Sequence, residues 1–471
     1  MKSIFTFLGA TVLAATSAAG AVGPDYQRPA IQAPIAWKNA SPDSGALPRS
    51  GWWKLFHDAR LDELEARALA ANQDLHAAAA RVEEARAAAG ATRGEYFPSV
   101  AFSPSVNRSR TSQTTDNVFP VAETTTVQGT LDAAWELDLF GRIRRENESA
   151  RDEAAASAAD FESLRLALTA EVASGYFTLR GLDRELDYAR KGVVLRRQFL
   201  KLIHVRRANG AATEFDVARA EGELASAEAE VSDLARRRAQ EKNALAVLLG
   251  AAAPDFAVAD DASPLPAPPA VPAGLPSALL ERRPDVAAAE YALAAANARI
   301  GVAKAAFFPA ISLTGSFGAA SGDVNRLFDG GSRLWSIGPT LYLPLFQGGR
   351  IRANLARSRA AYDENVARYR QRLLVAFREV QDSLTASRLL ADQAGAEQRA
   401  VTSATRAEQL AQTQFDAGYV STFEVIDAQR TLLATERVAT QVEARQLINS
   451  VGLIKALGGG WSRSTLVAST H

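Results

Sequence analysis

Apolar and polar residues alternate along residues 127–139, with Ala134 as the one exception, a pattern that places successive side chains on opposite faces of a β-strand. One face carries apolar or small residues, namely Val127, Gly129, Leu131, Ala133, Trp135, Leu137 and Leu139. The other carries Gln128, Thr130, Asp132, Glu136 and Asp138. The strand runs directly into residues 141–207, about 65 residues that include no proline, which favours a very long helix. An amphipathic strand joined to such a helix suggests a barrel continued by helices.

The segments around this strand predict a regular order of elements. Before it come an extended, proline-rich segment over 22–59 and an alanine-rich helix from about Leu61 to Thr92. A strand hairpin follows over about 98–140, and then a long helical hairpin over 141–250 that breaks near Gly210. A proline-rich linker covers 254–276.

The second half of the chain repeats the first, so the elements can be assigned twice. Asp74 and Asp285 are 211 positions apart, as are the Phe-Pro pairs at 97–98 and 308–309. After small gaps the separation is 208, for example between the Gly-Arg pairs at 141–142 and 349–350.

The repeats set the expected domain boundaries. Repeat 1 covers 60–253 and repeat 2 covers 277–460, followed by a C-terminal tail over 461–471. Repeat 2 contains a strand hairpin over about 309–346 and a helical hairpin over 349–458. Pro339 and Pro344 in its second strand would suit a bulge or a sheet edge.

Counting the strands limits the architecture. Each chain supplies four strands, whereas bacterial membrane barrels have eight or more, because an open edge in lipid leaves backbone groups unpaired. If all four face lipid, several chains must share one barrel. The helices, at about 1.5 Å per residue, would reach roughly 100 Å. Near-heptad apolar spacing in the second half, as at Val366, Leu373 and Val380, favours side-by-side coiled-coil packing.

Composition removes several functional classes. Lys plus Arg and Asp plus Glu each total 53, so no net charge attracts nucleic acid. The chain contains no cysteine, which excludes disulfides and thiolate chemistry. Residues 1–21 are typical of a signal peptide, with Lys2, an apolar run and a small-residue cleavage site at Ala21. No later run approaches the roughly 20 apolar residues of a membrane-spanning helix.

Catalytic chemistry is not indicated. The four histidines, His57, His76, His204 and His471, show no metal-binding spacing. The chain has no phosphate-binding glycine loop and no nucleophile–base pattern. We therefore expect no enzyme activity, no metal and no cofactor.

Eight motifs in a fixed order carry a family resemblance. They are GPDYQRP at 23–29, WW at 52–53, YFP at 96–98, WELDLFGR at 135–142, RRPDV at 282–286, FFPAISLTGSFG at 307–318, LPLFQGGR at 343–350 and GYVSTFEVIDAQR at 418–430. Together they resemble the TolC-like outer-membrane efflux proteins, in particular the branch that includes OprM, CusC and NodT. The resemblance covers nearly the whole chain after the signal peptide.

The resemblance implies a fold, a location and partners. It implies a homotrimer with a twelve-stranded β-barrel in the outer membrane of a Gram-negative bacterium, continued by a coiled-coil α-helical barrel in the periplasm. Such a protein is a passive exit duct for drugs or other small molecules. An inner-membrane pump, of the RND type, supplies the energy, and a periplasmic adaptor joins the two. Members of the branch usually carry a lipid-modified cysteine where this chain has Ala21, so thioether lipidation is impossible here. Either signal cleavage and the barrel suffice for attachment, or the residue was changed.

The turns of the two helical hairpins carry local signals. Gly210 and Gly418 suit left-handed helix C-caps, and Thr213 with Asp216 and Ser421 with Glu424 have capping-box spacing. Turn chemistry alone accounts for these residues. The resemblance implies that the same tips contact the adaptor.

Phe423 and Asp427 are candidates for a gate. The resemblance implies that both face the lumen at the periplasmic aperture, where threefold symmetry would make an apolar and a charged ring. The alternative is a surface ion pair between Asp427 and Arg430, three residues later.

Each face of the predicted strands also has an expected role. Asp132, Glu136 and Asp138 would make the lumen acidic and favour cations, or they are simply solvated. The residues expected to face lipid are Leu131, Trp135, Leu137, Phe317, Trp335 and Leu341. One rival interpretation is a periplasmic adaptor or structural protein of helical hairpins, without a membrane barrel.

Overall fold

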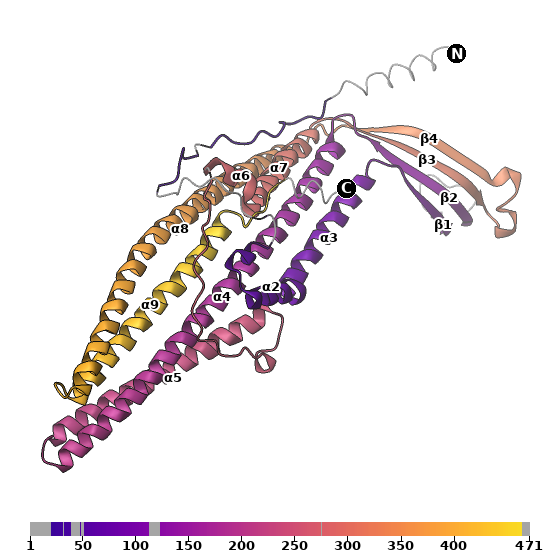
Figure 1. The fold of residues 1–471 in the computed structure, drawn as a ribbon. Coiled ribbons are helices and arrows are strands. Elements are labelled where there is room, and N and C mark those ends of the chain that lie inside the picture. The colour runs from indigo at the N-terminus through magenta and orange to yellow at the C-terminus, as the bar shows by residue number, and fades with distance from the viewer. Residues whose placement is uncertain are drawn as a thin grey trace. The chain divides into compact units, whose positions relative to one another are not determined.

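A computed structural model describes residues 20–31, 33–38, 48, 51–112, 123–274 and 276–463. Nearly all of the predicted signal peptide, and the C-terminal tail from residue 464, lie outside these residues. The principal elements are α2 Ala59–Ala71, α3 Gln73–Gly94, β1 Ser99–Arg110, β2 Glu123–Leu137, α4 Arg142–Ala208, α5 Glu214–Leu248, α6 Leu279–Arg282, α7 Pro284–Ala305, β3 Ala310–Ser321, β4 Arg333–Tyr342, α8 Arg350–Asp416 and α9 Thr422–Ala456 (Figure 1). The described residues also contain five short 3₁₀ segments, including η1 Trp52–Phe56.

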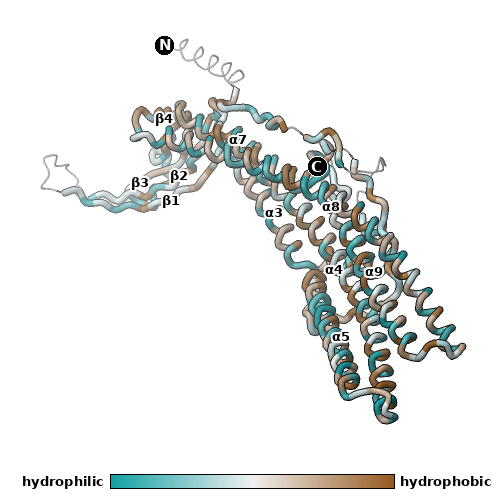
Figure 2. The backbone as a smooth tube through the Cα atoms, turned by 90° about the vertical axis from the view of Figure 1, so that its left-hand side faces the viewer, coloured by the Kyte–Doolittle hydropathy of each residue, from teal (hydrophilic) through white to brown (hydrophobic). Residues whose placement is uncertain are grey.

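The chain divides into two compact units. Unit 1 contains Met1–Ala30, Arg81–Ser157 and Ala288–Tyr369, and therefore holds the sheet. Unit 2 contains Ile31–Ala80, Ala158–Ala287 and Arg370–His471, and holds most of the long helices. Within the described residues, no helix has the length and apolarity that crossing a bilayer requires; apolar and polar residues are interleaved along the helices (Figure 2).

Unit 1 contains an antiparallel four-stranded sheet in the order β1-β2-β3-β4, so β1 and β4 are its edges (Figure 1). The register aligns large apolar residues in one row across all four strands, because Phe102 pairs with Leu131, Leu131 with Phe317, and Phe317 with Trp335. The next positions form a polar row that includes Asp132 and Ser316. The predicted alternation is therefore confirmed, and Pro339 lies in an edge strand as expected.

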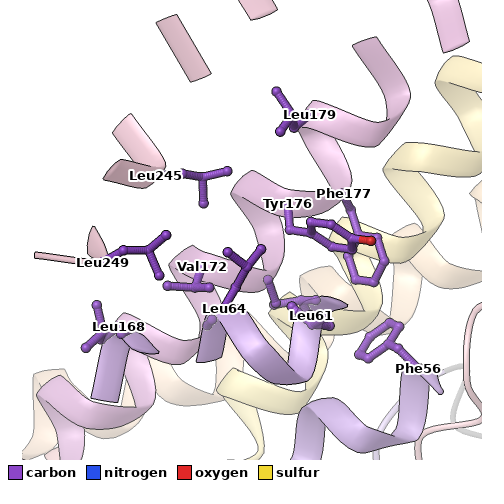
Figure 3. Packing of buried hydrophobic residues seen from close by; sticks show 14 of the residues in the cluster. Phe56, Leu61, Leu64, Leu168, Val172, Tyr176, Phe177, Leu179, Leu245 and Leu249 are labelled. Atoms are coloured by element: carbon purple, nitrogen blue, oxygen red, sulfur yellow. The ribbon is translucent and has the colours of Figure 1, made fainter. Parts of the chain in front are cut away.

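Unit 2 contains a hydrophobic core in which η1, α2, α4, α5 and α9 meet. Phe56, Leu61, Tyr176, Phe177 and Leu245 are almost completely buried there (Figure 3). At roughly 1.5–3 kcal/mol for each large apolar side chain removed from water, these contacts are the main force that holds the helices together.

The predicted repeats are present as repeated elements and as repeated contacts. α4 and α8 each contain 67 residues, and α5 and α9 each contain 35. Gly250 and Gly458 both have positive φ angles. A Cβ added at Gly250 would lie 2.2 Å from the carbonyl oxygen of Ala71, and a Cβ added at Gly458 would lie 1.9 Å from the carbonyl oxygen of Arg282. The two glycines are 208 positions apart and the two carbonyls 211, which matches the offsets in the sequence.

One predicted helix is divided. The pattern from Leu61 to Thr92 suggested a single helix, but the chain breaks at Asn72, whose backbone is extended. The Asn72 side chain accepts a hydrogen bond from the Leu75 N–H at 2.9 Å and donates to the Leu248 carbonyl at 3.0 Å. The side chain thus caps α3 and holds it to the end of α5. In repeat 2 the matching donor is Arg283, which bonds the Ala456 carbonyl at 3.0 Å.

Candidate functional site

The turns of the two helical hairpins have the same geometry. At the α4–α5 turn, Gly210 has φ 71° and the Ala211 N–H bonds the Arg206 carbonyl at 2.8 Å. At the α8–α9 turn, Gly418 has φ 76° and the Tyr419 N–H bonds the Gln414 carbonyl, also at 2.8 Å. A left-handed residue with this long-range bond is the Schellman helix end, so the predicted C-caps are confirmed.

Both predicted capping boxes are formed as well. The Asp216 carboxylate accepts from the Thr213 N–H at 2.8 Å, and the Thr213 hydroxyl accepts from the Asp216 N–H at 3.2 Å. Ser421 and Glu424 make the same reciprocal pair. The hydrogen bond from the Thr213 backbone lowers the pKa of Asp216, and the bond from the Ser421 side chain lowers the pKa of Glu424. Both boxes therefore remain intact at neutral pH and weaken as the pH falls through these depressed pKa values.

The gate candidates lie on the first two turns of α9. Phe423 packs edge-on against Phe199 of α4, with ring centroids 5.2 Å apart, and keeps 42% of its surface exposed. The Asp427 side chain is 64% exposed, and its oxygen lies 4.0 Å from the Arg430 guanidinium. Arg430 is closer to Glu223 of α5, at 3.1 Å. The distance between Asp427 and Arg430 is thus at the upper limit for an ion pair, and the Asp427 carboxylate is largely open to solvent.

Sequence reasoning missed the cross-links between α5 and α9. Arg430 pairs with Glu223, and Arg437 pairs with Glu230. The two arginines are seven positions apart, as are the two glutamates, so the pairs recur one heptad along both helices. This matched spacing of opposite charges is the signal that could have revealed them.

The acidic residues expected on the polar face of the sheet do not share one environment. Asp132 belongs to the polar row and accepts a hydrogen bond from the Thr130 hydroxyl at 3.2 Å. Glu136 instead receives two hydrogen bonds from Arg142, at 2.8 and 3.0 Å. Its negative charge is therefore compensated locally, which weakens the case for an acidic lumen at this residue.

Asp138 differs more clearly from the expectation. It lies beyond the end of β2, and its carboxylate accepts from the backbone N–H groups of Ile143 at 3.0 Å and Arg144 at 2.9 Å. A carboxylate in this position caps α4 and interacts favourably with the helix dipole. The placement thus gives Asp138 a structural role in joining the strand to the helix. A lumenal charge stays a prediction for Asp132.

The residues expected to face lipid lie on the apolar face of the sheet, where all except the half-buried Leu137 are exposed. Leu131, Phe317 and Trp335 are adjacent across three strands, and Trp335 is 74% exposed. Leu137, Ile311 and Leu341 form a second apolar row. Trp135 lies on the same face, and its indole N–H bonds the Tyr96 carbonyl at 3.0 Å. A contiguous apolar patch of this kind marks a surface that is covered by a membrane or by protein.

A small cavity lies where the strands of unit 1 meet its helices. It measures about 260 Å³ and is lined by the ends of β2 and α7 and by the start of α8, with both Arg142 and Arg350 on its wall. Nearby, the Val22 N–H bonds the Phe140 carbonyl at 3.0 Å, which fixes the chain next to Ala21 at the same junction.

Comparison with known proteins identifies the class of this fold. The family model described as outer membrane efflux protein matches residues 64–251 and 275–459, once in each repeat. The chain belongs to this family. It is an outer-membrane efflux channel of Gram-negative bacteria, and members of this family are not enzymes.

Individual relatives are similar over almost their whole length. The outer membrane protein OprJ of Pseudomonas aeruginosa is 38% identical, and the match covers 96% of both chains. The solvent efflux pump outer membrane protein SrpC of Pseudomonas putida is 37% identical over 94% of this chain and 95% of its own. The crystal structure of the Campylobacter jejuni CmeC outer membrane channel superposes with a TM-score of 0.85 at 25% identity, covering 94% of this chain and 96% of that one. These likenesses favour the channel over a periplasmic adaptor without a barrel.

Proposed function

We propose that three copies of this chain form one outer-membrane exit duct that receives its cargo from an inner-membrane pump through a periplasmic adaptor. The observation that carries the proposal is the sheet of unit 1. Among the described residues, both edges of this sheet are unpaired and its apolar face is exposed, so it is stable in a bilayer only when other copies extend it into a closed barrel. Three copies supply twelve strands, within the range of known membrane barrels.

The partners of this chain are also proposed. The exposed tips around Gly210 and Gly418, with Thr213, Asp216, Ser421 and Glu424, are proposed to contact the adaptor, and the pump is proposed to be of the RND type. SrpC is named as the outer-membrane protein of a solvent efflux pump. We propose organic solvents or drugs as the cargo of this chain, with selection made mostly by the pump.

Reconstitution and complementation test this function. The purified protein in detergent should have the mass of a trimer and should conduct ions across a planar bilayer. Expression in a bacterium that lacks its own exit channel should restore solvent and drug resistance when the matching pump and adaptor are present. A monomer that neither conducts nor restores resistance would contradict the proposal.

Asp427→Ala is expected to raise single-channel conductance several-fold. In the trimer, three Asp427 carboxylates and three Phe423 rings would narrow the periplasmic aperture, and removing the charge relaxes that constriction. Single-channel recordings across a range of pH values measure the effect. Asp392→Ala serves as the control, because Asp392 is also exposed on a long helix but lies far along the chain from the turn at Gly418. Conductance equal to that of the parent at every pH would instead support the surface pair with Arg430.

A further inference from the structure

The two repeats differ sharply in charge where strand becomes helix. In repeat 1, Arg142 is surrounded by three carboxylates, Glu136 at 2.8 Å, Glu146 at 2.9 Å and Glu95 at 3.0 Å. The matching arginine in repeat 2 is Arg350, 208 positions later and at the first position of α8. The internal repeat therefore allows the surroundings of the two arginines to be compared residue by residue.

All three acids are missing around Arg350. The residues that correspond to Glu95, Glu136 and Glu146 are Ala306, Pro344 and Asn354. Among the described residues, Arg350 forms no ion pair, and its guanidinium reaches only the Gln347 side-chain oxygen, at 3.1 and 2.8 Å. An exposed arginine is stable without a partner, but a second observation indicates a partner for Arg350.

The chain's own junction between repeats supplies that observation. Repeat 2 joins repeat 1 where β3 pairs with β2, and at this junction Arg142 and Ala306 line the same cavity. A second copy could join β4 of this chain in the same way that β3 joins β2 within the chain. The β1 strand of the second copy would then pair with β4, and the end of the second copy's α3 would lie beside the start of this chain's α8. The residue that corresponds to Ala306 would then be the partner's Glu95.

The register of such a junction can be calculated. Ala134 of β2 is opposite Thr314 of β3. The residue of repeat 2 that corresponds to Ala134 lies 208 positions later, at Tyr342, and the residue of repeat 1 that corresponds to Thr314 lies 211 positions earlier, at Ser103. Tyr342 would therefore lie opposite the partner's Ser103. The same operation places Leu341 opposite the partner's Pro104 and Thr340 opposite the partner's Ser105, so apolar positions meet apolar ones and polar positions meet polar ones. The strand order also makes β4 antiparallel to the added β1.

We propose that the contact between neighbouring copies repeats the β2–β3 junction within the chain, and that Arg350 forms an ion pair with the partner's Glu95. Glu95 already bonds Arg142 of its own chain at 3.0 Å, so the added bond would connect the arginines of two copies through one carboxylate. This inference rests on the proposed trimer, but it specifies a register and a residue pair that trimer formation alone does not determine.

Cysteine cross-linking tests both parts, because the full-length chain contains no cysteine of its own. The double variants are Glu95→Cys with Arg350→Cys, and Ser103→Cys with Tyr342→Cys. A third, Ser105→Cys with Tyr342→Cys, keeps the same face but shifts the register by two residues. Each is expressed in outer membranes, oxidised, and separated on a non-reducing gel. We expect covalent trimers from the first two pairs and far less from the third.

The outcomes separate this inference from the proposed function. Cross-linking of the shifted pair alone would overturn the register. Trimers from the Ser103–Tyr342 pair but not from the Glu95–Arg350 pair would leave the trimer standing and overturn the arginine contact. A protein that is monomeric in all three variants and in the parent would overturn the trimer itself.

A charge variant gives an independent measurement of the ion pair. Arg350→Gln should lower the temperature at which the trimer dissociates in detergent, whereas Arg352→Gln should not. Arg352 lies two positions further along α8, is also exposed, and faces a different side of the helix. Equal dissociation temperatures for Arg350→Gln and the parent would contradict a stabilising contact.

Discussion

Replacing Arg283 by alanine is expected to lower the free energy of unfolding by about 3–5 kcal/mol, because it would leave the largely buried carboxylate of Asp285 in unit 2 without its arginine partner. The Arg283 guanidinium bonds both oxygens of Asp285, at 2.9 and 2.8 Å, and one oxygen of Glu379 at 2.7 Å. It also donates to the Ala456 carbonyl, which would otherwise lack this partner at the end of α9. One side chain thus neutralises two acids and caps a helix.

The electrostatics of Asp285 show what the pair contributes. Burial raises the pKa of this carboxyl, but the hydrogen bonds and charge of Arg283 outweigh burial and hold the pKa below its usual value. A depressed pKa means that the stabilisation is complete above the ordinary carboxyl range and is lost as the pH falls through the depressed value. Without Arg283, Asp285 keeps the hydrogen bond from the Val286 N–H, at 3.0 Å, and the favourable charge of Arg372, but it loses the main compensation for its burial.

Guanidinium titration in detergent, followed by the helical circular dichroism signal, measures the change. Arg282→Ala is the matched control, because Arg282 is adjacent but exposed, and its loss should cost little. Adding Asp285→Asn to Arg283→Ala should recover part of the lost free energy of unfolding, because it removes the carboxylate charge that Arg283 had neutralised. If both arginine variants unfold at the same denaturant concentration, the buried pair does not stabilise the fold.

Local patterns predicted the elements of this fold well. The period-2 alternation located β2, and the absence of proline indicated α4. Each of these signals lies entirely within the segment that it predicts. Capping-box spacing identified Thr213 and Ser421 correctly for the same reason. The 208 and 211 offsets predicted that repeat 2 copies repeat 1, and the contacts of Gly250 and Gly458 show the copy at atomic level.

Features that depend on distant partners were not predictable. The break at Asn72 depends on the Leu248 carbonyl, 176 positions away, which no local pattern reveals. Asp138 looked like a continuation of the polar face, since alternation alone does not show where a strand ends. Its actual partners, the N–H groups at 143 and 144, are near enough that a helix-start signal could have indicated them. The gate, adaptor and lumen residues stay predictions, since their roles depend on other chains.

The second large effect concerns Glu65 of α2. The side chain is fully buried, as are those of Leu61, Leu64 and Ala68 in the same helix, and neither carboxylate oxygen has a hydrogen-bond donor among the described residues. Burial, with a smaller contribution from the negative charge of Asp62, raises the pKa of Glu65 to about 9. The folded protein therefore keeps this proton at neutral pH, whereas the unfolded chain releases it above its ordinary value of 4.5.

Glu65→Gln is expected to stabilise the protein by about 3 kcal/mol at pH 7. Because the folded pKa is raised, the wild-type protein is most stable below pH 4.5 and loses stability as the pH rises from there to about 9. Each pH unit in this window costs about 1.4 kcal/mol, so roughly 3 kcal/mol has been lost by pH 7. Glutamine has a similar shape and no proton to release, so it removes this loss.

The dependence on pH separates this mechanism from a general packing effect. Denaturant titrations at pH 4.5, 7 and 8.5 should give nearly equal stabilities for Glu65→Gln and the parent at the lowest pH, with a gap that widens upward. Glu63→Gln, on the exposed side of the same helix, should show no such gap. A constant difference in stability at all three pH values would mean that the substitution acts through packing. It would also mean that the pKa of Glu65 is the same in the folded protein and in the unfolded chain.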